Sequence, residues 1–114
     1  MIRVTFNRTE SGNIRSFTMS GHADFAKRGK DIVCAGASAV SFGAVNSIIQ
    51  LTGYTPDIQQ GKDGFLKCSF SDTLSEDVQA KVQLLLEGMI VSLQTIEKDY
   101  GKHIKITFKK QEVE

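Results

Sequence analysis

Cys34 and His22 are the residues of this sequence whose chemistry stands out. A cysteine thiolate is a nucleophile, and an imidazole accepts or donates a proton near neutral pH, so the pair could attack a carbonyl carbon. A loop joins His22 to the start of the helix expected to carry Cys34, which allows the two side chains to meet. The residues alone leave a second interpretation open, in which a small buried cysteine lies beside a surface histidine.

The position expected for Cys34 favours a reactive thiol. Asp31 is placed as the N-cap of a helix, so Cys34 falls in the first turn, where unpaired N–H groups and the helix dipole favour an anion. Asp31 either caps the helix or orients His22. Ser38 lies one turn after Cys34, where it either donates a hydrogen bond to the site or allows close helix packing.

The second cysteine and the second histidine have structural interpretations. Cys68 alternates with Lys67 and shares a strand face with Leu66 and Phe70, which predicts a core position. His103 follows the second helix and is expected to interact with the carbonyls at its C-terminal end. The sequence has no Cys-x-x-Cys or His-x-x-x-His pair, so we expect neither a metal site nor a cofactor.

The elements that must position Cys34 and His22 begin with a β-hairpin. Apolar residues alternate with polar ones over residues 2–6 and again over 17–19, with turn residues between them. Residues 22–30 have no clear hydrophobic period and contain several charges together with Gly29. We therefore expect this segment to be an exposed loop.

A long helix is predicted between the N-cap Asp31 and the stop signal Gly53. Phe42, Val45 and Ile49 fall outside its main apolar stripe, so the helix is apolar over much of its circumference and is expected to be buried on more than one side. The stripe itself consists of Val33, Ala37, Val40, Ala44, Ile48 and Leu51.

A second helix is predicted from Thr73, which forms a capping-box pattern with Glu76, to Gly101. Its apolar stripe includes Val78, Val82, Leu85, Met89, Leu93 and Ile96. A strand over residues 66–70, pairing with a short one at 57–60, precedes this helix, and a strand over 104–109 follows it.

The predicted order is strand, strand, helix, strand, strand, helix, strand. This order predicts an α+β fold in which two helices pack on a mostly antiparallel sheet, as a single domain over residues 1–114. The two helices carry more apolar surface than one sheet face needs. Either a homodimer covers the excess, or both helices are buried inside one domain.

Composition narrows the function classes. The 114 residues contain 14 Lys and Arg against 13 Asp and Glu, so the chain resembles neither a disordered protein nor a globally basic one, and we expect no direct nucleic-acid binding. Residues 32–56 lack charge, but their Ser, Asn, Gln and Gly argue against a membrane span. The N-terminal residues lack the pattern of a secretory signal, which leads us to expect a cytoplasmic protein with free thiols.

One motif resembles the signature of a known family. Gly21-His22-Ala23, followed by Gly-Lys-Asp-Ile-Val-Cys-Ala-Gly-Ala-Ser at residues 29–38, is similar to the signature of the ribosomal-processing cysteine protease family Prp, and the similarity extends over the whole chain. The resemblance implies that His22 and Cys34 are the catalytic pair. Asp31 and Ser38 match the other characteristic positions of the motif.

The resemblance also implies a substrate. A homodimeric enzyme of this kind removes the N-terminal extension of a large-subunit ribosomal protein, after an aromatic-rich apolar segment, and so supports ribosome assembly. We expect the backbone N–H of Cys34 to help stabilise the oxyanion. We also expect the loop that follows His22, with Gly29 as a hinge and Phe25 receiving aromatic substrate residues, to order over the bound peptide.

A non-catalytic, ribosome-associated dimeric scaffold is the alternative, with Cys34 as a packing residue. Alkylation distinguishes the two hypotheses, because a protease should have a Cys34 that reacts faster than Cys68. Redox or acyl-transfer chemistry is less favoured, since no resolving cysteine lies nearby in the sequence.

Overall fold

The computed structural model describes residues 1–110. Its element order confirms the predicted one and the α+β class. The predicted single domain over 1–114 includes residues 111–114, which lie outside the described residues. The elements are β1 (Ile2–Arg8), β2 (Ile14–Ser20), α1 (Ile32–Thr52), β3 (Asp57–Gln60), β4 (Leu66–Ser69), α2 (Glu76–Tyr100) and β5 (Ile104–Lys110).

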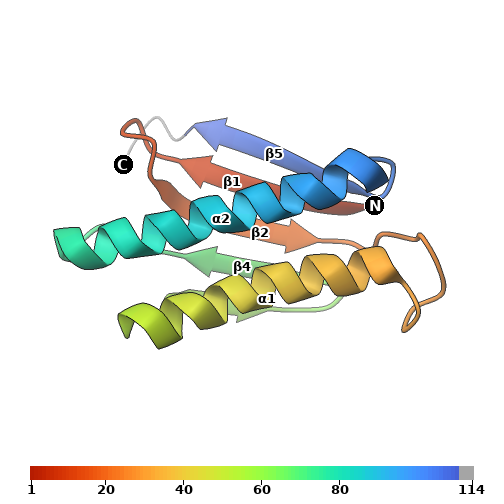
Figure 1. The fold of residues 1–114 in the computed structure, drawn as a ribbon, viewed down its shortest axis with the longest axis horizontal. Coiled ribbons are helices and arrows are strands. Elements are labelled where there is room, and N and C mark those ends of the chain that lie inside the picture. The colour runs from red at the N-terminus through yellow and green to blue at the C-terminus, as the bar shows by residue number, and fades with distance from the viewer. Residues whose placement is uncertain (111–114) are drawn as a thin grey trace.

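The five strands form one sheet in the order β3-β4-β2-β1-β5. All neighbouring strands are antiparallel except β1 and β5, which run parallel after α2 has crossed over. The two helices lie side by side over the same face of the sheet (Figure 1). The fold is therefore a two-layer sandwich with the core between helices and sheet.

Alternation of apolar and polar residues puts one face of each long strand into this core. Ile2, Val4 and Phe6 of β1 are buried, and the ring of Phe6 lies 5.6 Å from that of Phe17 on β2. Cys68 on β4 is fully buried. The predicted core position of Cys68 is thus confirmed.

Helix α1 begins and ends where the sequence predicts. Asp31 is its N-cap, and Gly53 adopts the left-handed conformation (φ 76°) and donates its N–H to the Ile49 carbonyl oxygen at 3.0 Å. The predicted stripe was wrong at two positions, since Leu51 is 69% exposed and Val45 is buried. A helix that is apolar nearly all round has no periodic signal to indicate which side faces the core.

Helix α2 has a different N-cap from the predicted one. The Oγ atom of Ser75 accepts the N–H of Val78 at 3.3 Å, while the Thr73 hydroxyl is paired with that of Ser71 at 2.7 Å. Serine and threonine can both cap a helix, but the hydroxyl of Thr73 is already hydrogen-bonded to that of Ser71. The helix ends at Tyr100, but Gly101 is right-handed (φ −61°) and is not the left-handed cap.

By length and composition, α1 could cross a membrane, with a mean hydropathy of 1.8. Core helices of soluble proteins pass the same test, and α1 packs beside α2 over the sheet. The absence of membrane association stays a prediction.

Four chain segments meet at one end of the sandwich. The connection from β2 to α1, the N-terminus and the start of β5 all lie there (Figure 1). The turn between β3 and β4 reaches the same place, because the N–H of Gly21 donates to the Asp63 carbonyl oxygen at 2.8 Å. This end holds Cys34 and His22.

Candidate active site

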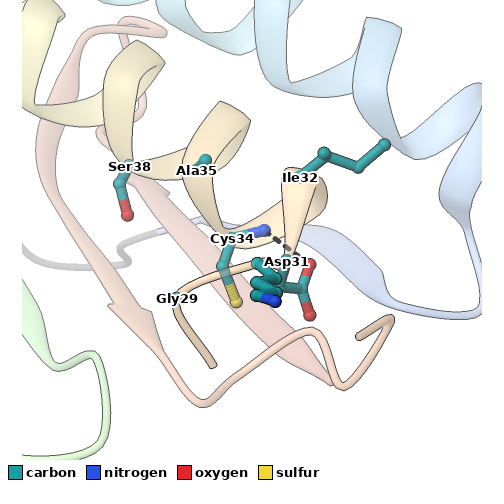
Figure 2. A pocket seen from close by; sticks show the side chains of 7 residues that line it. Gly29, Asp31, Ile32, Cys34, Ala35 and Ser38 are labelled. Atoms are coloured by element: carbon teal, nitrogen blue, oxygen red, sulfur yellow. Dashed lines mark hydrogen bonds between the residues drawn. The ribbon is translucent and has the colours of Figure 1, made fainter. Parts of the chain in front are cut away.

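Cys34 lies in the first turn of α1, as predicted, with its side chain partly exposed. The Oδ1 atom of Asp31 accepts the N–H groups of Val33 at 3.0 Å and Cys34 at 3.1 Å. Figure 2 shows the Asp31 carboxylate beside the backbone of Cys34 and the thiol directed into a cavity. The N-cap role of Asp31 is therefore confirmed.

Asp31 also holds the loop that precedes the helix. Its Oδ2 atom accepts the N–H groups of Phe25 at 2.9 Å and Ala26 at 3.1 Å. Burial opposes the charged form of the carboxyl group, but the four backbone donors outweigh it and hold the pKa of Asp31 below its ordinary value. One carboxylate thus connects the helix start to the loop, a second role that the sequence did not indicate.

The thiol of Cys34 has a hydrogen-bond donor from the loop. The backbone N–H of Ala23 points to the Cys34 Sγ atom at 3.2 Å, and Ala23 is buried. A backbone N–H can donate to sulfur, so the loop contacts the Cys34 side chain directly. The thiol therefore lies between a helix N-terminus and a backbone N–H group.

His22 and Cys34 lie in the wall of one cavity of about 110 Å³. The His22 Nε2 atom is 3.9 Å from the Asp63 Oδ1 atom, on the turn between β3 and β4. Within residues 1–110, no hydrogen bond joins His22 to Cys34. The fold brings the predicted pair to one cavity. Asp63, which is far from His22 in the sequence, faces the imidazole.

A second cavity, of about 400 Å³, is also lined by Cys34. Cys34 and Ser38 line both cavities, whereas Gly29 lines only the larger one. Figure 2 shows Ser38 one turn along the helix from Cys34, on the same side. Gly29 has a φ of 87°, a left-handed conformation that favours glycine at this point of the loop.

Phe25 lies away from both of these cavities in the free protein. Its ring meets Tyr100 and His103 edge-on, with centroids 5.4 Å and 5.2 Å away, and lines a third cavity with them. Contact between Phe25 and substrate stays a prediction, which requires the loop to move.

Asp63 and His103 are site neighbours that sequence reasoning missed. The backbone N–H of His103 donates to the carbonyl oxygen of Tyr100 at the end of α2, as expected, but its Nδ1 atom is 2.9 Å from the Ala23 carbonyl oxygen, a contact that the sequence did not indicate. The Lys62-Asp63-Gly64 turn indicated a hairpin but not that its tip reaches His22. A contact between residues so far apart in sequence leaves no local pattern.

The site suits nucleophilic chemistry by a thiol. Within the described chain, no cluster of three His, Cys, Asp or Glu side chains could hold a metal ion. Cys34 is partly exposed and lines two cavities, which leaves room for a ligand beside its sulfur.

Comparisons with known proteins agree with this chemistry. The family model described as cysteine protease Prp matches residues 1–105. The ribosomal processing cysteine protease Prp of Bacillus subtilis is 48% identical over 108 residues, covering 94% of this chain and 96% of that protein. Its namesake from Staphylococcus aureus is 44% identical over 96% of this chain and 100% of its own.

Solved structures show the same fold. The S. aureus protease bound to a covalently linked product peptide superposes with a TM-score of 0.87 at 44% identity, covering 96% of this chain and 100% of that one. A Streptococcus mutans structure gives a TM-score of 0.82 at 29% identity, covering 97% and 96%. The family model and these relatives together show that the chain belongs to the cysteine protease Prp family.

Proposed function

We propose that this cysteine protease removes the N-terminal extension of a large-subunit ribosomal protein, cutting after an aromatic-rich apolar segment, and thereby supports ribosome assembly. The observation that carries the proposal is the Cys34 thiol at the N-terminus of α1, open to two cavities. The S. aureus relative is a ribosomal processing protease whose structures hold a substrate peptide and a covalently linked product peptide. Membership in this family favours the protease over the non-catalytic scaffold.

Catalysis uses Cys34 and His22. Once His22 has taken the thiol proton, the sulfur attacks the scissile carbonyl carbon, and the imidazolium then gives its proton to the leaving amine as the C–N bond breaks. Water, deprotonated by His22, hydrolyses the thioester and restores the thiol. In the free protein the imidazole lies 3.9 Å from Asp63 and, in the part of the chain that the structure describes, no hydrogen bond joins it to the sulfur of Cys34, so proton transfer requires the two groups to approach each other.

Two backbone N–H groups are candidates for the oxyanion contact. In the free protein that of Cys34 donates to Asp31 at 3.1 Å, and that of Ala23 donates to the Cys34 sulfur at 3.2 Å. We propose that the Ala23 N–H turns from the sulfur to the oxyanion as the tetrahedral intermediate forms. The contribution expected from the Cys34 N–H stays a prediction.

The active unit is a homodimer formed through the outer face of the helices. Leu84 and Val91 of α2 are 74% and 62% exposed, and Leu51 of α1 is also exposed. A groove of about 330 Å³ runs between α1 and α2 beside Leu84. Light scattering should give twice the chain mass, and Leu84→Lys should shift it toward the monomer. A wild-type monomer at micromolar concentration would refute this part.

We further propose that the enzyme works in the cytoplasm, where a ribosomal-protein substrate is made, and that it neither associates with a membrane nor binds nucleic acid directly. Cell fractionation should recover it with soluble proteins. Recovery in washed membranes would overturn this placement.

Intact-mass analysis tests the proposed reaction. An extended large-subunit ribosomal protein is incubated with wild-type enzyme, with Cys34→Ala and with Cys68→Ala. One N-terminal truncation that requires Cys34 but not Cys68 is expected, because Cys68 is buried away from the cavities. Cleavage by the Cys34→Ala enzyme, or none by the folded wild type, would refute the proposal.

A binding assay tests the role of Phe25. The Cys34→Ala enzyme should bind a peptide that contains the aromatic segment, and adding Phe25→Ala should weaken that binding. Unchanged affinity would show that Phe25 packs against Tyr100 and His103 in the free protein but does not contact the peptide.

A further inference from the structure

The side chain of His103 reaches the active-site loop from another part of the fold. His103 lies just before β5, yet its Nδ1 atom is 2.9 Å from the Ala23 carbonyl oxygen. A carbonyl oxygen can only accept a hydrogen bond, so Nδ1 carries the proton and donates it. This contact joins the start of β5 to the residue that follows His22.

The backbone of His103 is held on both sides. Its N–H donates to the Tyr100 carbonyl oxygen at 2.8 Å, and its own carbonyl oxygen accepts the N–H of Ile2 at 2.9 Å. The imidazole therefore projects from a fixed corner, where α2 ends and β5 starts beside β1. A side chain on such a rigid corner can hold a loop in one position.

Ala23 lies between His103 and the thiol. It is 1% exposed, its carbonyl oxygen accepts from His103, and its N–H donates to Cys34 Sγ. Phe25, two residues on, rests edge-on against both the His103 and the Tyr100 rings. These contacts hold the loop at Ala23, whose N–H faces the sulfur.

We propose that His103 is a positioning residue of this protease, which fixes Ala23 so that its N–H faces the Cys34 sulfur and stabilises the thiolate. The inference rests on the proposed role of Cys34 as nucleophile. Without the His103 donor, the Ala23 carbonyl loses its anchor, the loop moves, and the sulfur loses its N–H partner. The contact works by hydrogen bonding, so another side chain with a donor at the same position should replace it.

Three substitutions separate the donor from the ring. His103→Leu removes the donor but keeps apolar volume beside Phe25. His103→Asn places an amide donor near the position of Nδ1, and His103→Gln places it about one methylene farther away. Lys105→Leu, at an exposed position of β5, is the matched control.

The readout is the pH profile of Cys34 alkylation by iodoacetamide, followed by mass spectrometry of the Cys34 peptide, with thermal unfolding recorded for each protein. For His103→Leu, alkylation of Cys34 at pH 7 should be about tenfold slower than in the wild type, the effect of losing one hydrogen bond to the sulfur. His103→Asn should react close to wild type, His103→Gln should resemble the Leu variant, and the control should be unchanged.

Two results would overturn the proposal. One is wild-type alkylation by a folded His103→Leu protein. The other is equal rates for the Asn and Gln variants, which also decides the matter if His103→Leu does not fold. Because alkylation needs no substrate, failure to cut a ribosomal protein would refute the proposed function and leave this inference standing.

Discussion

The thiols of Cys34 and Cys68 should react with an alkylating reagent at very different rates. Burial raises the pKa of Cys68 to about 11 from an ordinary value of 9.0, and the negative charge of Asp57 adds to the shift. Cys34 is partly exposed, at a helix N-terminus, and accepts an N–H. Iodoacetamide added to the folded protein should therefore label Cys34 first.

The magnitude follows from the thiolate fraction. Below its pKa, a thiol loses about tenfold in thiolate for each pH unit, so the rise at Cys68 means about a hundredfold less thiolate at neutral pH than an ordinary thiol has. Cys68 is also 0% exposed, which denies the reagent access. Labelling of Cys68 in the folded state should thus be more than about a hundredfold slower than in the unfolded chain.

The assay is timed alkylation at pH 7, followed by acid quench, digestion and mass spectrometry of the two cysteine peptides. Guanidinium chloride provides the control, since unfolding should bring both thiols to similar rates. Cys34→Ala should leave Cys68 slow in the folded protein. Comparable labelling of Cys34 and Cys68 in folded wild type would refute the reasoning, because it would mean that burial does not protect Cys68.

Three further predictions concern the site and its support. Gly21→Ala should lower the free energy of unfolding by about 2 kcal/mol, because the φ of Gly21 is 87° and an added Cβ would collide with the Met1 carbonyl oxygen. Urea titration measures this free energy, and an unchanged value would count against the clash. The ion pair with Arg8 lowers the pKa of Glu87, and four backbone N–H groups lower the pKa of Asp31. The stability that these two carboxylates add is therefore present at neutral pH and is lost as pH falls below about 4.5. Glu87→Gln should reduce that acid sensitivity in pH-dependent urea unfolding, and an unaltered slope would exclude the pair as its source. Asp31→Asn should free the loop and slow peptide cleavage, with faster limited proteolysis between residues 22 and 30; an equally resistant loop would contradict the anchoring role.

Local sequence signals determined the elements and the position of Cys34. Alternating residues specify the strands because successive side chains point to opposite faces. Asp31 and Gly53 set the ends of α1 because a carboxylate accepts the free N–H groups and glycine tolerates the left-handed conformation. Those two rules place Cys34 in the first turn before any tertiary contact is considered.

The surroundings of the thiol were decided by tertiary structure alone. Asp63 faces His22, and His103 holds Ala23, through contacts between segments far apart in the chain, and neither periodicity nor capping encodes such a meeting. The same holds for α1, whose apolar surface on most sides left its buried face to packing against α2 and the sheet. Short-range preferences act within a turn or a strand, whereas the geometry of this site depends on how whole elements pack against one another.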